Sequence, residues 1–153
     1  MQVRRLGLGD TALLRETARD DRDFDISERG EAREELSEAA AEAYLADPTV
    51  LHWVAEHHGR VEGFLHCQII RKHAGNPLEL LLYEVGVRQS ARRRGVGRAL
   101  LQEMQRYMRE QAVSEVWVLA DNLEAIQFYE ACGFTRPEGM AVYLTADITN
   151  SPR

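Results

Sequence analysis

The segment from Val85 to Leu101 reads Val85-Gly86-Val87-Arg88-Gln89-Ser90-Ala91-Arg92-Arg93-Arg94-Gly95-Val96-Gly97-Arg98-Ala99-Leu100-Leu101. An apolar strand enters a basic loop, and the loop opens an amphipathic helix with two glycines in its first turn. The first amides of a helix have no partner within it, and the helix dipole makes that end positive. Gly95 and Gly97 carry no Cβ, so an anion can approach the backbone closely. The segment therefore predicts a phosphate-binding site.

Two common nucleotide-binding loops do not fit this segment. No Gly-Lys-Ser or Gly-Lys-Thr follows the glycines, and Leu100 stands where a dinucleotide-binding loop needs glycine. The spacing Arg-x-x-Gly-x-Gly from Arg92 to Gly97 instead resembles the acetyl-CoA pyrophosphate signature of the GNAT superfamily of N-acetyltransferases. A glycine-containing helix start with surface arginines is the alternative interpretation.

A second segment, from Asn122 to Phe134, resembles the other shared GNAT pattern, Asn-x-x-Ala-x-x-x-Tyr-x-x-x-Gly-Phe. It follows the glycine-rich helix and one further strand, in the order that the family has. The resemblance implies one α+β domain over residues 1–153, with a mixed α/β GNAT fold. Its central, mostly antiparallel twisted sheet would have about seven strands, flanked by about four helices.

Hydrophobic periodicity and end signals predict the elements along the chain. We expect strands over Gln2–Leu6, Val50–Glu56, Arg60–Arg71, Leu78–Val87, Glu115–Ala120 and Met140–Thr145, and helices over Asp10–Arg19, Glu31–Ala46, Gly95–Gln111 and Leu123–Cys132. His57-His58-Gly59 reads as the turn of a hairpin.

Composition narrows the functional classes. The chain has 153 residues, of which 44% are hydrophobic and 29% charged, and this balance excludes a disordered chain. Two cysteines make no disulfide framework, no apolar run is long enough for a membrane helix, and no signal peptide is visible, so we expect a cytoplasmic protein. The net charge of −6 argues against nucleic-acid binding and favours a cationic small-molecule partner.

The resemblance implies acetyl-CoA as cofactor and assigns residues to it. The backbone of the basic loop would hold the pyrophosphate, the backbone of Val85 and Val87 would pair with the pantetheine arm, and Asn122 would contact that arm. Tyr129 would protonate the departing thiolate, the alternative being a core aromatic residue beside Phe128. The cofactor-binding set is thus Val85, Val87, Arg92, Arg93, Arg94, Gly95, Val96, Gly97, Arg98 and Asn122.

Acetyl transfer to an amine also needs a base, because a protonated amine has no lone pair. Glu84 is the candidate, and Glu79, acting directly or through a water, is the alternative. Strict alternation would place Glu84 on one strand face with Leu80 and Leu82, and Glu79 on the other. A salt bridge is the other interpretation of Glu84. No histidine has metal-site spacing. His66 reads as a surface strand residue, the alternative being a residue that lines a pocket.

A closer resemblance concerns the acceptor. The stretches from Glu79 to Val87 and from Val118 to Asp121 are similar to the gentamicin-type aminoglycoside 3-N-acetyltransferases. The predicted acceptor-binding residues are Asp21, Asp23, Asp25, Glu79 and Glu84, although a charge run is often only a solvated loop. The alternatives are a polyamine, an amino-acid-like or a protein amine as acceptor, or an acyl-CoA-binding module without turnover. The resemblance further implies a homodimer.

Overall fold

The computed structural model describes residues 1–24, 35–75, 77–139 and 142–146. The chain forms two compact units, Met1–Ala120, which contains the sheet, and Asp121–Arg153, which contains the helix α4 (Leu123–Ala131). The expectation of one domain over residues 1–153 stays a prediction. No helix among the described residues is long and apolar enough to cross a membrane.

The first unit is a five-stranded sheet in which the order in space follows the order in sequence. The pairings along β1 to β4 are antiparallel, and β5 lies parallel to β4. The strands are β1 (Gln2–Arg5), β2 (Val50–His57), β3 (Arg60–Arg71), β4 (Leu78–Val87) and β5 (Val116–Val118), and the helices are α1 (Thr11–Arg19), α2 (Glu38–Ala46) and α3 (Val96–Glu110). The mixed α/β fold class is confirmed, with five strands described instead of about seven.

The β2–β3 hairpin forms where it was predicted. His58 and Gly59 have φ angles of 51° and 75°, the left-handed conformation that both central residues of a type I′ turn adopt. Such turns match the twist of the flanking strands, so the register of the hairpin is determined locally.

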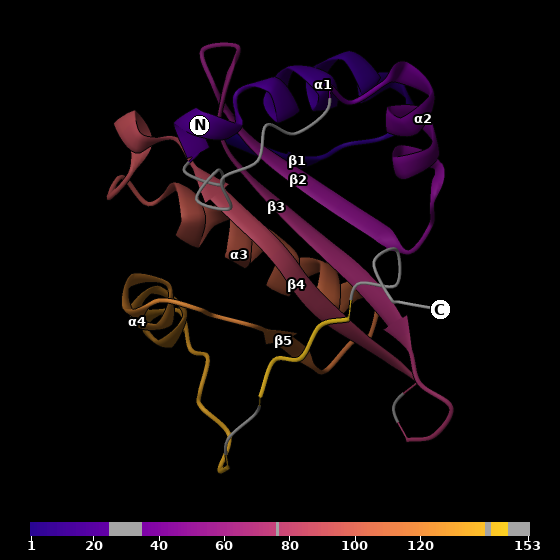
Figure 1. Ribbon diagram of the computed structural model, residues 1–153, viewed down its shortest axis with the longest axis vertical. Helices are drawn as coiled ribbons and strands as arrows, with labels where there is room; N and C mark the ends of the chain where they lie inside the picture. Colours follow the sequence, from indigo (N-terminus) through magenta and orange to yellow (C-terminus); the bar gives the residue numbers. More distant parts are fainter. Residues whose placement is uncertain (25–34, 76, 140–141, 147–153) are drawn as a thin grey trace. The chain divides into compact units, whose positions relative to one another are not determined.

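Helices cover both faces of the sheet (Figure 1). On one face α3 packs Leu100 and Met104 against fully buried strand residues, among them Leu65 and Leu82. Gly63 permits this close approach, since a Cβ there would lie 2.7 Å from Cγ1 of Val96. On the opposite face α1 and α2 enclose a second cluster that contains Leu6, Leu14, Phe24, Ala41, Val54, Val61 and Phe64.

A β-bulge in β4 overturns the predicted alternation. Leu82 pairs with Cys67, but Glu84 pairs with His66, the very next residue of β3, so Tyr83 is the extra residue. Glu84 therefore lies on the face opposite to Leu82, not on the same face. Since Glu79 precedes the bulge, the same shift places both glutamates on the α1–α2 face.

Two predicted elements differ from the structure. Helix α2 begins at Glu38 because the Ser37 hydroxyl caps it by accepting from the Ala40 amide at 3.1 Å, so the helical prediction is wrong for residues 35–37, while 31–34 lie outside the described residues. The last predicted strand is wrong over 142–145, where the apolar side chains of Val142, Tyr143 and Leu144 are exposed and no ladder partner is described. Residues 140 and 141 lie outside the described part of the chain.

Candidate active site

The basic loop has the backbone geometry of an anion site. After β4, the short turn η4 (Gln89–Ala91) leads to Arg93 and Gly95, whose φ angles are 60° and 82°. Left-handed residues between right-handed ones turn successive N–H groups toward one side, which makes a concave anion-binding surface. Gly95 is the N-cap of α3 and gives no side-chain cap, and the first turn has no acidic residue. The first amides of α3 are thus left for a ligand.

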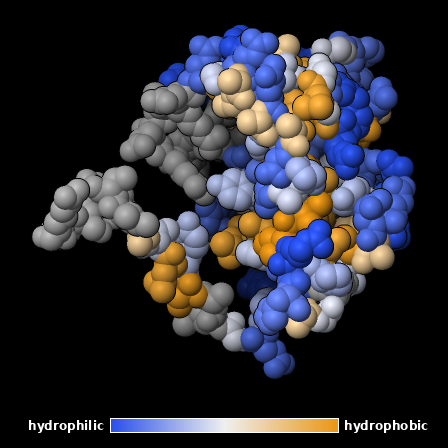
Figure 2. Space-filling view, turned by 90° about the vertical axis from the view of Figure 1, so that its right-hand side faces the viewer, coloured by the Kyte–Doolittle hydropathy of each residue, from blue (hydrophilic) through white to orange (hydrophobic). Residues whose placement is uncertain are grey.

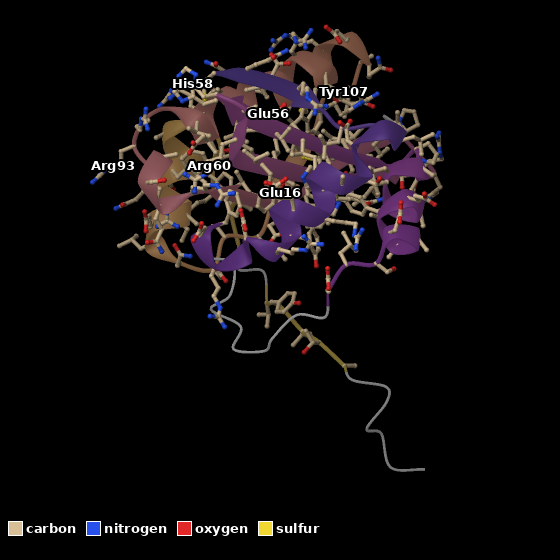
Figure 3. All side chains as sticks on the ribbon, turned by 90° about the horizontal axis from the view of Figure 1, so that it is seen from above. Glu16, Glu56, His58, Arg60, Arg93 and Tyr107 are labelled. Atoms are coloured by element: carbon tan, nitrogen blue, oxygen red, sulfur yellow. The ribbon has the colours of Figure 1, made fainter. Side chains whose placement is uncertain are left out.

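Positive charge surrounds this loop. Arg93, Arg94 and Arg98 are exposed, and Figure 3 shows Arg93 pointing away from the body of the protein. Arg92 is half-buried, and its Nε donates to the Val87 carbonyl at 3.4 Å, which ties the loop to the end of β4. The structure therefore brings the predicted residues from Arg92 to Arg98 together at the N-terminus of one helix.

The face of the sheet that carries Glu84 also carries two histidines. His52 on β2 is the cross-strand partner of His66 on β3, which is in turn the partner of Glu84 on β4. Tyr44 of α2 covers the row, with ring centroids 5.8 Å from His52 and 5.2 Å from His66, and its hydroxyl lies 2.9 Å from Nδ1 of His52. The Tyr83 ring lies 5.1 Å from His66. We call these five residues the histidine–tyrosine cluster.

Burial keeps the imidazoles of this cluster neutral. It lowers the pKa of His52 to about 3, with a smaller effect from His66, and it also lowers the pKa of His66. The pKa of Tyr44 is raised, first by burial and then by the negative charge of Glu84. The Nε2 atoms of both histidines are buried without a hydrogen-bond partner among the described residues. Glu84 thus lies on the face of the sheet that carries these two neutral imidazoles.

Glu79 belongs to a different environment. Its Oε2 lies 3.4 Å from Nζ of Lys72, and its Oε1 accepts from Nε1 of Trp117 at 3.2 Å. Five residues of strand separate it from Glu84, which corresponds to roughly 16 Å. Although both carboxylates share a face, one acceptor amine cannot contact both, and Glu79 already has a cation.

The acidic segment before residue 25 forms ion pairs with Arg88, which lies directly after β4. This side chain is 4% exposed, and it donates to Oδ2 of Asp23 at 2.7 Å, to Asp20, and to the Val61 carbonyl at 2.6 Å. Its guanidinium also lies 4.5 Å from the centre of the Phe24 ring. Asp20 and Asp23 therefore hold η2 (Asp21–Phe24) against the end of β4.

Of the other predicted acidic residues, Asp25 lies outside the described residues, as does the side chain of Asp21. Asp23 has a second cation nearby, with Arg60 at 3.9 Å. The carboxylate charge that was expected to face a polycation is thus partly neutralised within the protein. Its role in acceptor binding stays a prediction.

The second unit holds Asn122 and Tyr129. Oδ1 of Asn122 accepts from the Ala125 amide at 2.8 Å, so this side chain caps α4. Tyr129 is buried, with ring centroids 5.3 Å from both Phe128 and Phe134. Both the aromatic packing and the motif position of Tyr129 were anticipated, whereas the capping role of Asn122 was not.

Tyr44, His52 and Arg88 were not singled out from the sequence, and for His66 a position lining a pocket was only the alternative interpretation. The signal for the histidines was present, since each lies at an inward position of an apolar strand and such a residue is seldom a surface residue. The reading of His66 as a surface residue is therefore wrong. Arg88 had no local signal, because its partners lie 65 and 68 residues away in the chain.

Comparison with known proteins places the chain in a family. Residues 4–134 match the acetyltransferase (GNAT) family, so the chain belongs to this family, whose members are enzymes that use acetyl-CoA. A mycothiol acetyltransferase of Arthrobacter sp. (strain FB24) is 30% identical over 113 residues, which cover 72% of this chain and 35% of the relative. The chain thus spans about a third of the length of that curated relative.

Solved structures share the fold. An aminoglycoside acetyltransferase from an uncultured soil metagenomic sample superposes with a TM-score of 0.81 at 18% identity, covering 95% of this chain and 96% of the other. An aminoglycoside N-acetyltransferase in complex with CoA gives a TM-score of 0.71 at 18% identity, covering 95% and 100%. At these identities the likeness shows the GNAT fold and leaves the acceptor open.

Proposed function

We propose that this protein is an acetyl-CoA-dependent N-acetyltransferase that acetylates a primary amine of a cationic small molecule, an aminoglycoside of the 3-N type being the first candidate. One observation carries the proposal: the bulge at Tyr83 turns Glu84 toward the histidine–tyrosine cluster. A carboxylate on the same face as neutral imidazoles suits the removal of a proton from an ammonium group. Two further findings support the proposal. The chain belongs to the acetyltransferase (GNAT) family, and the basic loop of residues 92–98, called the anion loop below, directly follows the strand that carries Glu84.

The cofactor fits the residues present. The left-handed residues Arg93 and Gly95, the open first turn of α3 and the exposed arginines suit a pyrophosphate group. The backbone of Val85 and Val87 would pair with the pantetheine arm. Bound acetyl-CoA supplies the acetyl group as a thioester. The chain would hold it through this backbone and Asn122, remove the amine proton at Glu84, and deliver a proton from Tyr129.

Glu84 is the proposed base rather than Glu79. The carboxylate oxygens of Glu79 are already occupied by contacts with Lys72 and Trp117. We propose that Glu79 contributes negative charge to the acceptor side together with Asp21, Asp23 and Asp25. Clefts of one sign concentrate ligands of the other sign, even when single carboxylates are already paired.

The acceptor is tested by measuring thiol release from acetyl-CoA with gentamicin, kanamycin, spermidine, lysine and a basic peptide. Rapid turnover with gentamicin is the expected result, and mass spectrometry of the product gives the acetylated position. Turnover with spermidine or the peptide alone would replace the aminoglycoside proposal by a polyamine or peptide acceptor. Tight acetyl-CoA binding without turnover on any amine would indicate an acyl-CoA-binding module.

The assembly and the location are separate proposals. We propose a cytoplasmic homodimer, as the family resemblance implies. Light scattering of the purified full chain tests the dimer, and a mass of 17.4 kDa for the particle would show a monomer instead.

A further inference from the structure

His66 has an unusual position next to the proposed base. It faces Glu84 directly across the β3–β4 pair, on the same face of the sheet. Side chains of such opposed residues have Cβ atoms about 5 Å apart. Tyr44 and Tyr83 contact the imidazole from α2 and β4, with ring centroids 5.2 and 5.1 Å away. The two tyrosine rings therefore hold the imidazole at the position opposite Glu84.

Nε2 of His66 is buried and makes no hydrogen bond among the described residues. Buried polar atoms in folded proteins almost always have a hydrogen-bond partner. We therefore expect this nitrogen to gain a hydrogen bond at some stage of the reaction. A neutral imidazole can offer a ring nitrogen as an acceptor. When Glu84 takes the proton of the amine, it becomes a protonated carboxyl group. Its O–H then needs a hydrogen-bond acceptor of this kind.

We propose that His66 is a positioning residue for Glu84, which accepts a hydrogen bond from the protonated carboxyl group and so strengthens Glu84 as a base. This inference rests on the proposed function of Glu84. One proton would move from the acceptor ammonium to a carboxylate oxygen of Glu84, and the freed amine would take the acetyl group as the carbon–sulfur bond of the thioester breaks. The departing thiolate would take the proton of Tyr129, and the second proton of the nitrogen would restore that hydroxyl. His66 keeps its own protons throughout, and Glu84 releases the proton to solvent after the product leaves.

Burial shifts the pKa values of the titratable groups around His66 so that these groups stay neutral. Tyr44 from α2 and Cys67 from β3 have pKa values raised by burial, that of Cys67 to about 12, and His52 from β2 has a pKa near 3. The ring of Tyr83 on β4 lies 5.1 Å from that of His66. The pKa of His66 is itself lowered by burial, which is partly offset by the Gln68 side chain. In the proposal the proton taken from the acceptor therefore stays on Glu84, while His66 remains neutral.

The chain offers a matched control for the test. His66→Leu removes the acceptor, and His66→Gln retains a side chain that can accept a hydrogen bond. His52→Leu deletes a more deeply buried imidazole on the same face, one strand further from Glu84. A loss due only to disturbed packing would therefore be at least as large in His52→Leu as in His66→Leu.

The first measurement is the titration of the Glu84 carboxyl carbon by NMR, assigned with Glu84→Gln, in each variant. We expect the pKa of Glu84 to fall by about half a unit or more in His66→Leu, to recover in His66→Gln, and to stay unchanged in His52→Leu. This readout needs no acceptor. An unchanged pKa of Glu84 in a folded His66→Leu protein would overturn the proposal.

The second measurement is the pH dependence of kcat with the acceptor that turns over. His66→Leu should move the acidic limb to lower pH and reduce the plateau about fivefold, because a weaker base removes the proton less readily. If Glu84→Gln leaves kcat unaffected, the proposed role of Glu84 fails. If Glu84→Gln abolishes the acidic limb while His66→Leu leaves it in place, Glu84 stands and the role of His66 is wrong.

Discussion

The hydroxyl of Tyr129 is the group that we propose protonates the departing thiolate. Tyr129→Phe keeps the ring that packs against Phe128 and Phe134 and removes only that hydroxyl. We expect kcat to fall about a hundredfold while the Kd for acetyl-CoA stays within about twofold, since the proton is needed only as the thiolate forms. Steady-state kinetics and calorimetry measure the two quantities. Tyr143→Phe, at an exposed tyrosine of the same unit, is the control, and an unchanged kcat in Tyr129→Phe would remove this role.

The burial of His52 makes the free energy of unfolding depend on pH. Its pKa in the folded protein is about 3, below the ordinary value of 6.5, because the ring is buried. The unfolded chain therefore binds more protons between these values, and the free energy of unfolding falls as the pH drops through that window. The slope approaches about 1.4 kcal/mol per pH unit for this group. Urea unfolding at pH 7 and pH 5 should show a smaller difference for His52→Leu than for the natural protein, while His73→Ala, at an exposed histidine, should leave the difference intact.

Between elements, the contact of α3 with the sheet depends on Gly63. A Cβ at this position would meet Cγ1 of Val96 at 2.7 Å, the Gly86 carbonyl oxygen at 3.0 Å and Cδ1 of Leu100 at 3.2 Å. Gly63→Ala should therefore push α3 away and cost about 1–3 kcal/mol of unfolding free energy. Because Val96 begins the helix whose amides form the anion loop, CoA binding should weaken as well. Gly9→Ala, where a Cβ meets nothing within 4 Å, is the control, and equal stability of the two variants would contradict the close contact.

At the scale of the whole protein, a positively charged cluster stands out in a chain whose net charge is negative. The chain carries −6 overall, and the face in Figure 2 is mostly hydrophilic, yet arginines gather at the start of α3. Exposed charge attraction is screened by salt, so raising the ionic strength from about 50 to about 500 mM should weaken CoA binding about tenfold. The double variant Arg93→Gln/Arg94→Gln should bind more weakly at low salt and lose most of that dependence. Arg109→Gln, at the other end of the helix, should behave as the natural protein does in calorimetric titrations.

The anion loop, the hairpin and most element boundaries follow from the sequence. Arg92 to Gly97, the turn at His58 and Gly59, and the alternation of apolar residues act over a few neighbouring positions, so their consequences can be read from those positions alone. The family also follows from two such local motifs. Even the error at the start of α2 is local, since Ser37 was available as a cap.

Tertiary structure alone decided what surrounds the proposed base. The face on which Glu84 lies depends on where β3 and β4 shift register, and one extra residue at Tyr83 reverses it. Arg88 takes Asp20 and Asp23 as partners across more than sixty residues, which changes the meaning of the acidic segment. His52 and His66 become neighbours only because β2 and β3 pair. These properties arise from contacts between distant parts of the chain, and no short stretch of sequence encodes them.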